Sequence, residues 1–241
     1  MSHNNLKALT LSIIIPVHNE ESYIGACLDS IANQTIMPDE VIVVDNNCKD
    51  RTAEVVSKYS FATLIRETTQ GIVYARNSGF NKASSDIIAR IDADTNLKSS
   101  WVANVKALAS SLDDNSGAVT GPCDFRDWDL KMAVFWGHRV LYFWTSHLFL
   151  GHRTLFGSNM FIMRSTWQEV SSSICLRNDI HEDMDLAVHV TTIGSKVYFS
   201  KKMEASVSPR RIFKMWHYPA MWLRTKLVTH TLSSIAEEVS P

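Results

Sequence analysis

The chain of 241 residues carries 24 Lys or Arg against 25 Asp or Glu, and 45% of its residues are hydrophobic. This balance is typical of globular proteins, so it excludes an extensively disordered chain. The near-zero net charge gives no reason to expect a nucleic acid partner, and we expect none. No linker-like segment divides the sequence, and its length suits one sizeable domain over residues 1–241.

Cysteine usage and the N-terminal segment bear on the cellular compartment. The four cysteines are far apart and include no Cys-x-x-Cys pair, so a zinc site is unsupported. The N-terminus lacks the basic flank, long apolar region and small-residue cleavage site of a signal peptide. These two observations together predict a cytoplasmic protein.

The first half of the chain alternates short apolar runs with segments of helical periodicity. Strands are predicted at 11–16, 41–44 and 62–65, and helices at about 24–31, 52–59 and 71–79. Strand and helix alternating in this order are the start of a doubly wound α/β fold. We therefore expect a central, mostly parallel sheet with helices on both faces.

Two polar residues follow the second predicted strand. Asp45 and Asn46 lie at its carboxyl end, where the ligands of open α/β sheets collect. A carboxylate and an amide at this position can recognise the base and ribose of a nucleotide. An Asx-turn and a helix N-cap are the structural alternative, which accounts for Asp50 better than for Asp45. Because no Gly-x-Gly-x-x-Gly follows the first strand, a nicotinamide cofactor is not expected.

A second acidic loop follows a buried strand predicted at 87–91. Asp92 and Asp94 come at the end of this run, one residue apart. An Asp-x-Asp pair there suits Mg²⁺ or Mn²⁺ holding a diphosphate, because these ions take carboxylate oxygens and substrate phosphates. Roles in a turn and as a helix N-cap explain Asp92 and Asp94 equally well. A helix with Trp101 on its buried face is predicted to begin near residue 99.

Arg76 lies in the helix predicted at 71–79. Its guanidinium is a candidate ligand for a phosphate. A solvated surface position is the commoner role of a single helical arginine, so both interpretations stay open.

The second half contains a glycine and an asparagine before a predicted strand within 155–164. Gly157 would allow close approach of a ligand, and Asn159 could bond a sugar hydroxyl. A turn leading into a buried strand explains Asn159 equally well. Other strands in this half are predicted at 118–121, 196–200 and 205–208.

Adjacent acids begin the last predicted helix. Glu182 and Asp183 precede an apolar face of helical spacing, and Gly194 suits the C-terminal cap. Acids in a first turn are also favoured by the helix dipole alone. Beyond the last strand, Arg210 and Arg211 have the planar donor groups that bind phosphate.

Two segments are dense in aromatic residues. Residues 125–149 and 212–226 mix Trp, Tyr or Phe with His, Arg or Lys. In the first segment, His138, Arg139 and His147 argue against a membrane span and for a buried or interfacial helix. Core packing is the default interpretation. The alternative is peripheral contact with the inner face of the cell membrane, near a lipid-linked acceptor.

Four blocks of the first half together match a known family. They read Ser-Ile-Ile-Ile-Pro-Val-His-Asn-Glu-Glu (12–21), Val-Val-Asp-Asn-Asn-Cys-Lys-Asp-Arg-Thr (43–52), Ala-Arg-Asn-Ser-Gly (75–79) and Ile-Asp-Ala-Asp-Thr (91–95). In order and spacing they resemble the family-2 glycosyltransferases with the GT-A fold, over roughly residues 10–211. This resemblance implies one nucleotide-diphospho-sugar transferase domain, with a donor half at 8–121, an acceptor and catalytic half at 122–211, and a basic aromatic segment at 212–241.

The resemblance also implies a donor site for a UDP- or GDP-sugar. The residues implied in donor binding are Pro16, His18, Glu20, Asp45, Asn46, Arg76, Asp92 and Ala93. Asp92 and Asp94 would bind Mn²⁺ or Mg²⁺ on the donor diphosphate. Many relatives carry Asp at position 46 and Ser at position 48, so Asn46 and Cys48 leave the base preference open.

For the reaction, the resemblance implies metal-assisted, inverting transfer of a hexosyl group by a single displacement. Asp183 matches the base of the family's Glu-Asp motif. The residues implied in acceptor or phosphate contacts are Gly157, Asn159, Glu182, Arg210 and Arg211. The acceptor would be a glycan or a lipid-linked molecule. Transfer of one sugar is favoured, because the Gln-x-x-Arg-Trp signature of processive members is absent.

Two other function classes remain possible from the sequence. A nucleotidyltransferase also uses a metal held by Asp, but it usually carries a Gly-rich basic loop after its first strand. This chain has an acidic loop at 17–21 instead. A non-catalytic nucleotide-sugar binding module would keep the donor residues and have no use for Asp183.

Overall fold

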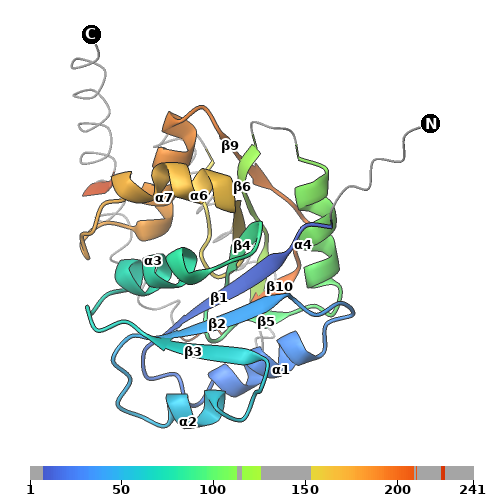
Figure 1. The fold of residues 1–241 in the computed structure, drawn as a ribbon, viewed down its shortest axis with the longest axis vertical. Helices are drawn as coiled ribbons and strands as arrows, with labels where there is room; N and C mark the ends of the chain where they lie inside the picture. The colour runs from blue at the N-terminus through green and yellow to red at the C-terminus, as the bar shows by residue number, and fades with distance from the viewer. Residues whose placement is uncertain (1–7, 113–115, 126–152, 209, 211–223, 226–241) are drawn as a thin grey trace.

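The computed structural model describes residues 8–112, 116–125, 153–208, 210 and 224–225 (Figure 1). The described elements are, in order, β1 (Leu11–Val17), α1 (Ile24–Ala32), β2 (Glu40–Asp45), α2 (Thr52–Val56), β3 (Ala62–Arg66), α3 (Ile72–Lys82), β4 (Ile87–Arg90), β5 (Asn96–Leu97), α4 (Trp101–Ser110), β6 (Ser116–Thr120), β7 (Cys123–Phe125), β8 (Met160–Met163), α6 (Arg164–Val170), η1 (Ser171–Ser173), α7 (Glu182–Thr192), β9 (Lys196–Phe199) and β10 (Ala205–Val207).

Seven strands form the central sheet in the order β3-β2-β1-β4-β8-β6-β9. The pairs β3–β2, β2–β1 and β1–β4 are parallel, and so is β6–β9. Only β8 is reversed among these strands, because it runs antiparallel to both β4 and β6. The expected mostly parallel sheet is therefore confirmed. A second, three-stranded sheet has the order β5-β10-β7.

Both faces of the central sheet are covered by helices, as the apolar strands require. Ile13 and Ile15 of β1 pack in one hydrophobic cluster with residues of α1 and α4. Ile14, which points to the opposite face, packs in a second cluster with residues of α3, α6 and α7. Figure 1 shows the same division, with α3, α6 and α7 on one side of the sheet and α1 and α4 on the other.

The predicted elements are found with small shifts of their ends. The helix that begins at Glu182 ends where predicted, because Gly194 follows it with a left-handed φ of 81°. The sequence prediction missed β5, β7 and α6. β5 and β7 have two and three residues, too short to show an alternating pattern. The predicted strand at 205–208 exists as β10, but it belongs to the small sheet.

One glycine brings α3 unusually close to the sheet. A Cβ at Gly79 would overlap the side chain of Ile14 and lie 3.0 Å from Val44 Cγ2. The helix therefore rests directly on β1 and β2, and its first turn reaches the edge of the sheet where those strands end. This places Ile72 and Ala75 beside the site described below.

No helix within the described part of the chain is long and apolar enough to cross a membrane. Most of the two aromatic segments at 125–149 and 212–226 lies outside the described residues. Their assignment to the core or to a membrane surface therefore stays a prediction, as does the division into donor and acceptor halves.

Candidate active site

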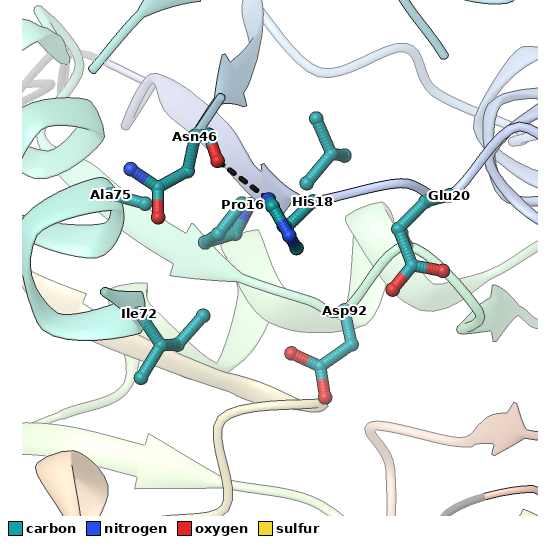
Figure 2. Close-up of a pocket in the computed structure, with 9 residues that line it drawn as sticks. Pro16, His18, Glu20, Asn46, Ile72, Ala75 and Asp92 are labelled. Carbon is teal, nitrogen blue, oxygen red and sulfur yellow. Dashed lines mark hydrogen bonds between the residues drawn. The ribbon is translucent and has the colours of Figure 1, made fainter. Parts of the chain in front are cut away.

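A pocket lies where β1, β2 and β4 end, at the carboxyl edge of the sheet (Figure 2). Its lining residues are Pro16, Val17, His18, Glu20, Asn46, Ile72, Ala75, Asp92 and Ala93. Six of the eight predicted donor residues are in this lining; Asp45 and Arg76 are not. Figure 2 shows Glu20 and Asp92 on one side of the pocket and Asn46 on the other. The topology thus brings the segments after β1, β2 and β4 and the start of α3 together at one edge of the sheet. Open α/β sheets bind ligands at this edge.

The side chain of Asn46 is occupied by the protein itself. Its Nδ2 donates to the carbonyl oxygens of Glu67 and Thr69, at 3.0 and 2.7 Å. Its Oδ1 accepts from the backbone N–H of Gly71 at 2.9 Å and from Gln70 Nε2 at 3.2 Å. Asn46 therefore fastens the 67–71 loop that forms one wall of the pocket. The predicted direct contact with a nucleotide base gains no support from this placement.

Asp45 forms the turn that was its structural alternative. Its Oδ1 accepts from the backbone N–H of Cys48, three residues further on, at 2.7 Å, so the carboxylate closes the turn after β2. Burial, together with the Asp45 carboxylate, raises the pKa of the Cys48 thiol to about 11. Cys48 is therefore a neutral thiol at physiological pH, and its Sγ donates to the carbonyl oxygen of Val17. Both residues stabilise the loop at this end of β2.

His18 is fixed in one tautomer at the mouth of the pocket. Its Nδ1 lies 2.7 Å from the carbonyl oxygen of Asn46 (Figure 2). A carbonyl only accepts, so Nδ1 carries the proton and Nε2 is an acceptor. Its Nε2 lies 3.3 Å from Asn19 Nδ2, which can donate to it.

Arg76 is fully buried, so the interpretation as a solvated surface group is wrong. Its Nη1 donates to the carbonyl oxygen of Glu182 at 2.8 Å, and Nε and Nη2 donate to Asn77 Oδ1. The guanidinium has no exposed surface for a phosphate in this arrangement. Arg76 instead links α3 to the start of α7.

Asp92 projects into the pocket and is held from two sides. Its Oδ2 accepts from Ser158 Oγ at 2.5 Å, and its Oδ1 accepts from Arg90 Nη2 at 3.2 Å. The side chain keeps 18% of its surface exposed. Its orientation is therefore fixed while part of the carboxylate stays accessible from the pocket.

Asp94 and Glu20 converge on a single cation, Arg210. Arg210 Nε donates to Asp94 Oδ2 at 2.8 Å, and Nη2 donates to Glu20 Oε2 at 2.6 Å. Its Cζ also lies 4.0 Å from the centre of the Tyr23 ring, a cation–π contact. Both carboxylates are buried, and the guanidinium places a positive charge between them. Arg211, predicted beside Arg210, lies outside the described residues.

The arrangement of these acids fits a divalent cation. Among the described residues, no cluster of three or more His, Cys, Asp or Glu side chains could hold a metal ion. Mg²⁺ and Mn²⁺ need only one or two carboxylates when a substrate phosphate and water complete the shell. Asp94 and Glu20 are two hard oxygen donors that already converge on one positive group. The chemistry of this donor set therefore suits either ion.

Asp183 and Glu182 lie in the first turn of α7 and face Arg90 at the end of β4. Arg90 Nη1 donates to Asp183 Oδ1 at 2.5 Å and to Glu182 Oε1 at 3.3 Å. The other oxygen of Asp183, Oδ2, accepts from the backbone N–H of Gly157 at 2.8 Å. A Cβ at Gly157 would overlap the Arg90 guanidinium, so a side chain here would displace that group. The predicted base is thus held through both of its oxygens.

The two acids respond differently to this buried setting. Burial raises the pKa of Asp183, and the Arg90 guanidinium offsets only part of that effect. For Glu182, burial acts in the same direction, but Arg90, His181 and Arg76 outweigh it and lower its pKa. A raised pKa brings Asp183 closer to the range in which a general base works best.

Asn159 is completely buried and bonded to the protein. Its Nδ2 donates to the carbonyl oxygens of Pro122 and Met203, and its Oδ1 accepts from Trp101 Nε1 at 2.9 Å. The side chain therefore ties three segments together beneath the site. The predicted contact with a sugar hydroxyl gains no support, and the turn before a buried strand is what the structure has.

The sequence analysis missed two residues of the site, Arg90 and Ser158. Arg90 follows the apolar residues 87–89 in a strand that is buried throughout. A buried arginine needs partners, so this position could have signalled a cluster of acids. Ser158 lies between the two predicted residues Gly157 and Asn159, and no pattern distinguished it.

The sheet, the carboxylates at its edge and the pocket define the GT-A fold of glycosyltransferases. A mannosyltransferase from Pyrobaculum calidifontis, solved with GDP-Man and Mn²⁺, matches with a TM-score of 0.68 and 23% identity, over 98% of this chain and 67% of its own. The glucosyl-3-phosphoglycerate synthase of Mycobacterium tuberculosis, solved with Mn²⁺, UDP and phosphoglyceric acid, matches with a TM-score of 0.65 and 17% identity, over 93% and 78%. The expected GT-A fold is confirmed.

The sequence comparison then gives the family. Residues 12–167 match the sequence model of glycosyl transferase family 2, so the chain belongs to that family. Among curated relatives, glycosyltransferase AglE of Haloferax volcanii is 37% identical over 99 residues, which is 38% of this chain and 33% of that protein. The probable glycosyltransferase YdaM of Bacillus subtilis is 34% identical over 128 residues, 48% of this chain and 30% of that protein. The matches span about a third of either relative's length.

Proposed function

We propose that the protein transfers one sugar from a UDP- or GDP-sugar to an acceptor hydroxyl, with inversion at the anomeric carbon. The observation that carries this proposal is the joining of two sites by Arg90. One is the pocket bordered by Asp92, and the other is the buried acid Asp183. A donor pocket and a base held on one rigid group are what a single displacement requires.

Solved GT-A structures support the donor class. The Pyrobaculum calidifontis mannosyltransferase was solved with GDP-Man, and Staphylococcus aureus TarS with UDP-GlcNAc. Both are nucleoside diphosphate sugars, and the pocket of this chain lies at the carboxyl edge of the same fold. Ile72 and Pro16 offer apolar surface for a base.

Mn²⁺ or Mg²⁺ is the proposed cofactor, and Asp94 with Glu20 or Asp92 would hold it. Bound there, the ion would neutralise negative charge that develops on the departing nucleoside diphosphate. The guanidinium of Arg210 carries the same sign of charge and lies at the same carboxylates. It is therefore placed to bind the diphosphate oxygens once they enter the pocket.

Asp183 is the proposed base. It would accept the proton of the acceptor hydroxyl as that oxygen attacks, and its raised pKa makes it a stronger base than an ordinary aspartate. Arg90 and Gly157 hold its two oxygens, so the carboxylate does not rotate during the reaction. A single base on the face opposite the leaving group predicts inversion.

The acceptor and the location extend this proposal. Contact of residues 212–241 with the inner membrane face, near a glycan or lipid-linked acceptor, is supported by the Trp, Tyr, Lys and Arg residues of that segment. A cytoplasmic location is supported by the four widely separated cysteines. Sedimentation with anionic liposomes at low salt tests the contact. Protein that stays in the supernatant would contradict it.

Calorimetric titration of UDP and GDP, with and without Mn²⁺, tests the donor site. Wild type should bind one nucleotide in a metal-dependent manner, and Asp94→Ala should lose that dependence. Glu54→Ala is the matched control, because Glu54 is exposed on α2. Absence of binding by either nucleotide would contradict the proposed donor.

Product analysis separates the alternatives. A glycosyltransferase releases a nucleoside diphosphate from its donor, whereas a nucleotidyltransferase releases pyrophosphate. A binding module releases neither. Detection of pyrophosphate, or of no product with any UDP- or GDP-sugar, would replace the proposed function.

A further inference from the structure

Arg90 is the point at which three carboxylates meet, one from the loop after β4 and two from the start of α7. Its Nη2 donates to Asp92, and its Nη1 donates to both Glu182 and Asp183. Only 3% of its surface is exposed, and it lies on β4 between β1 and β8. A residue of the central sheet thus connects the pocket to the start of α7.

The charge of this arginine is secured by its surroundings. Burial opposes the charged form, but Asp183, Asp92 and Glu182 outweigh it and raise the pKa of Arg90. Arg76 lies close enough to oppose this with a like charge, although its own hydrogen bonds go to Asn77 and the Glu182 carbonyl. The three acids therefore share a permanent cation, and without it they would repel one another.

The geometry of the guanidinium matters as much as its charge. A planar fork has fixed distances between its nitrogens, whereas the ammonium group of lysine is a point charge on a flexible stem. Because Nη1 and Nη2 serve different carboxylates, the plane sets the separation of Asp92 and Asp183. Gly157 secures the other oxygen of Asp183 and leaves space for the Arg90 guanidinium.

We propose that Arg90 is a positioning residue that fixes the proposed base, Asp183, at a set distance and angle from the donor carboxylate Asp92. This inference rests on the proposed function, since it assigns the base and the donor site their roles. In a single displacement the base must align with the bond to the leaving group, and a shift of about 1 Å can cost 10²-fold in rate. Arg90 acts through Asp183 and does not itself contact the reacting atoms.

Arg90→Lys and Arg90→Met test this role against wild type. The readouts are nucleotide affinity by calorimetry, and kcat and KM for release of nucleoside diphosphate from the donor. Arg90→Met should lower kcat by about 10²-fold and change nucleotide affinity and donor KM by less than about threefold. Arg90→Lys keeps the charge and should recover roughly a tenth of the wild-type kcat. Arg177→Lys, an exposed arginine paired with Asp179, is the control.

A double-mutant cycle separates positioning from a general structural effect. If Arg90 acts through Asp183, Arg90→Lys should change the residual kcat of Asp183→Asn by less than about twofold. A loss equal to that in the wild-type background would overturn the proposal, and so would an Arg90→Lys enzyme with wild-type kcat. If Arg90→Met fails to fold, the cycle of Arg90→Lys with Asp183→Asn still tests whether Arg90 acts through Asp183. A wild type that releases no nucleoside diphosphate would overturn the proposed function itself.

Discussion

The backbone N–H of Gly157 donates to Asp183 Oδ2, and the same glycine leaves the space that the Arg90 guanidinium fills. A side chain at this position would separate Arg90 from Asp183, because a Cβ would overlap the guanidinium and lie 2.7 Å from Asp183 Oδ1. The loop before β8 can therefore pack against the first turn of α7 because Gly157 has no side chain.

Gly157→Ala should consequently impair both the fold and the reaction. Overpacking a buried site of this kind costs about 1–3 kcal/mol of unfolding free energy. Displacement of the proposed base should lower kcat by about 10²-fold. Denaturant unfolding and donor turnover measure the two effects. Gly25→Ala is the control, since a Cβ there would lie at ordinary distances, 3.6 Å from Val55 and 3.7 Å from Tyr59. Equal behaviour of the two variants would contradict the account.

Asn46→Asp should weaken the wall of the pocket. The substitution removes the two N–H donors to Glu67 and Thr69 and sets a negative charge against their carbonyl oxygens. Leaving such buried groups unsatisfied costs about 1–3 kcal/mol. Denaturant unfolding should show this loss, and nucleotide affinity should fall with it. Asn33→Asp, at an exposed amide that also donates to a carbonyl, should change stability little. An unaffected Asn46→Asp protein would mean that the loop is held by other contacts.

Arg210→Gln should have opposite effects on metal and nucleotide binding. Removing the guanidinium leaves Asp94 and Glu20 without that positive partner, so Mn²⁺ should bind about tenfold more tightly in the absence of nucleotide. Nucleotide affinity should fall, because a phosphate donor is lost. Free Mn²⁺ measured by electron paramagnetic resonance reports the first effect, and calorimetry reports the second. Arg51→Gln, an exposed arginine paired with Glu21, is the control. Weaker Mn²⁺ binding by Arg210→Gln would count against a shared cation position.

The pH dependence of turnover should reflect the buried setting of Asp183. Catalysis needs its ionised form, and burial raises its pKa above the usual value of about 3.9. As pH is lowered, kcat should therefore fall with a midpoint above that value. The residual kcat of Asp183→Asn should not show this fall. For stability the sign is opposite to that of an acid whose pKa is lowered on folding. A raised folded-state pKa stabilises the fold at low pH, and that contribution is lost as pH rises through the folded value.

Local patterns were sufficient for the sheet and for the loops of the pocket. The apolar runs before Asp45 and Asp92 predicted where β2 and β4 end, and the loops after β1, β2 and β4 do meet at one edge. The roles of individual polar side chains were harder to predict. Asn46 and Asn159 were expected to face ligands, but their amides bond backbone carbonyls from segments far away in the sequence. Sequence alone does not show which carbonyls need a donor.

Arg90 illustrates the same limit more strongly. Its partner Asp183 is 93 residues away, and no periodicity within either segment links them. The contact depends on the order of strands in the sheet and on how α7 packs against it. What the sequence did contain was a single buried charge in an apolar strand, and buried charges demand partners.

Because β8 is antiparallel to its neighbours, the loop that enters it lies at the carboxyl edge of the parallel strands. Met160, the first residue of β8, pairs with Arg90, the last residue of β4. The loop that arrives at β8 therefore meets the loops that depart from β1, β2 and β4. In a parallel orientation Gly157 and Ser158 would enter at the far edge, and a four-residue strand spans about 13 Å. Because β8 is reversed, the loop before it contacts both Asp92 and Asp183, so a change in that loop should affect the donor carboxylate and the proposed base together.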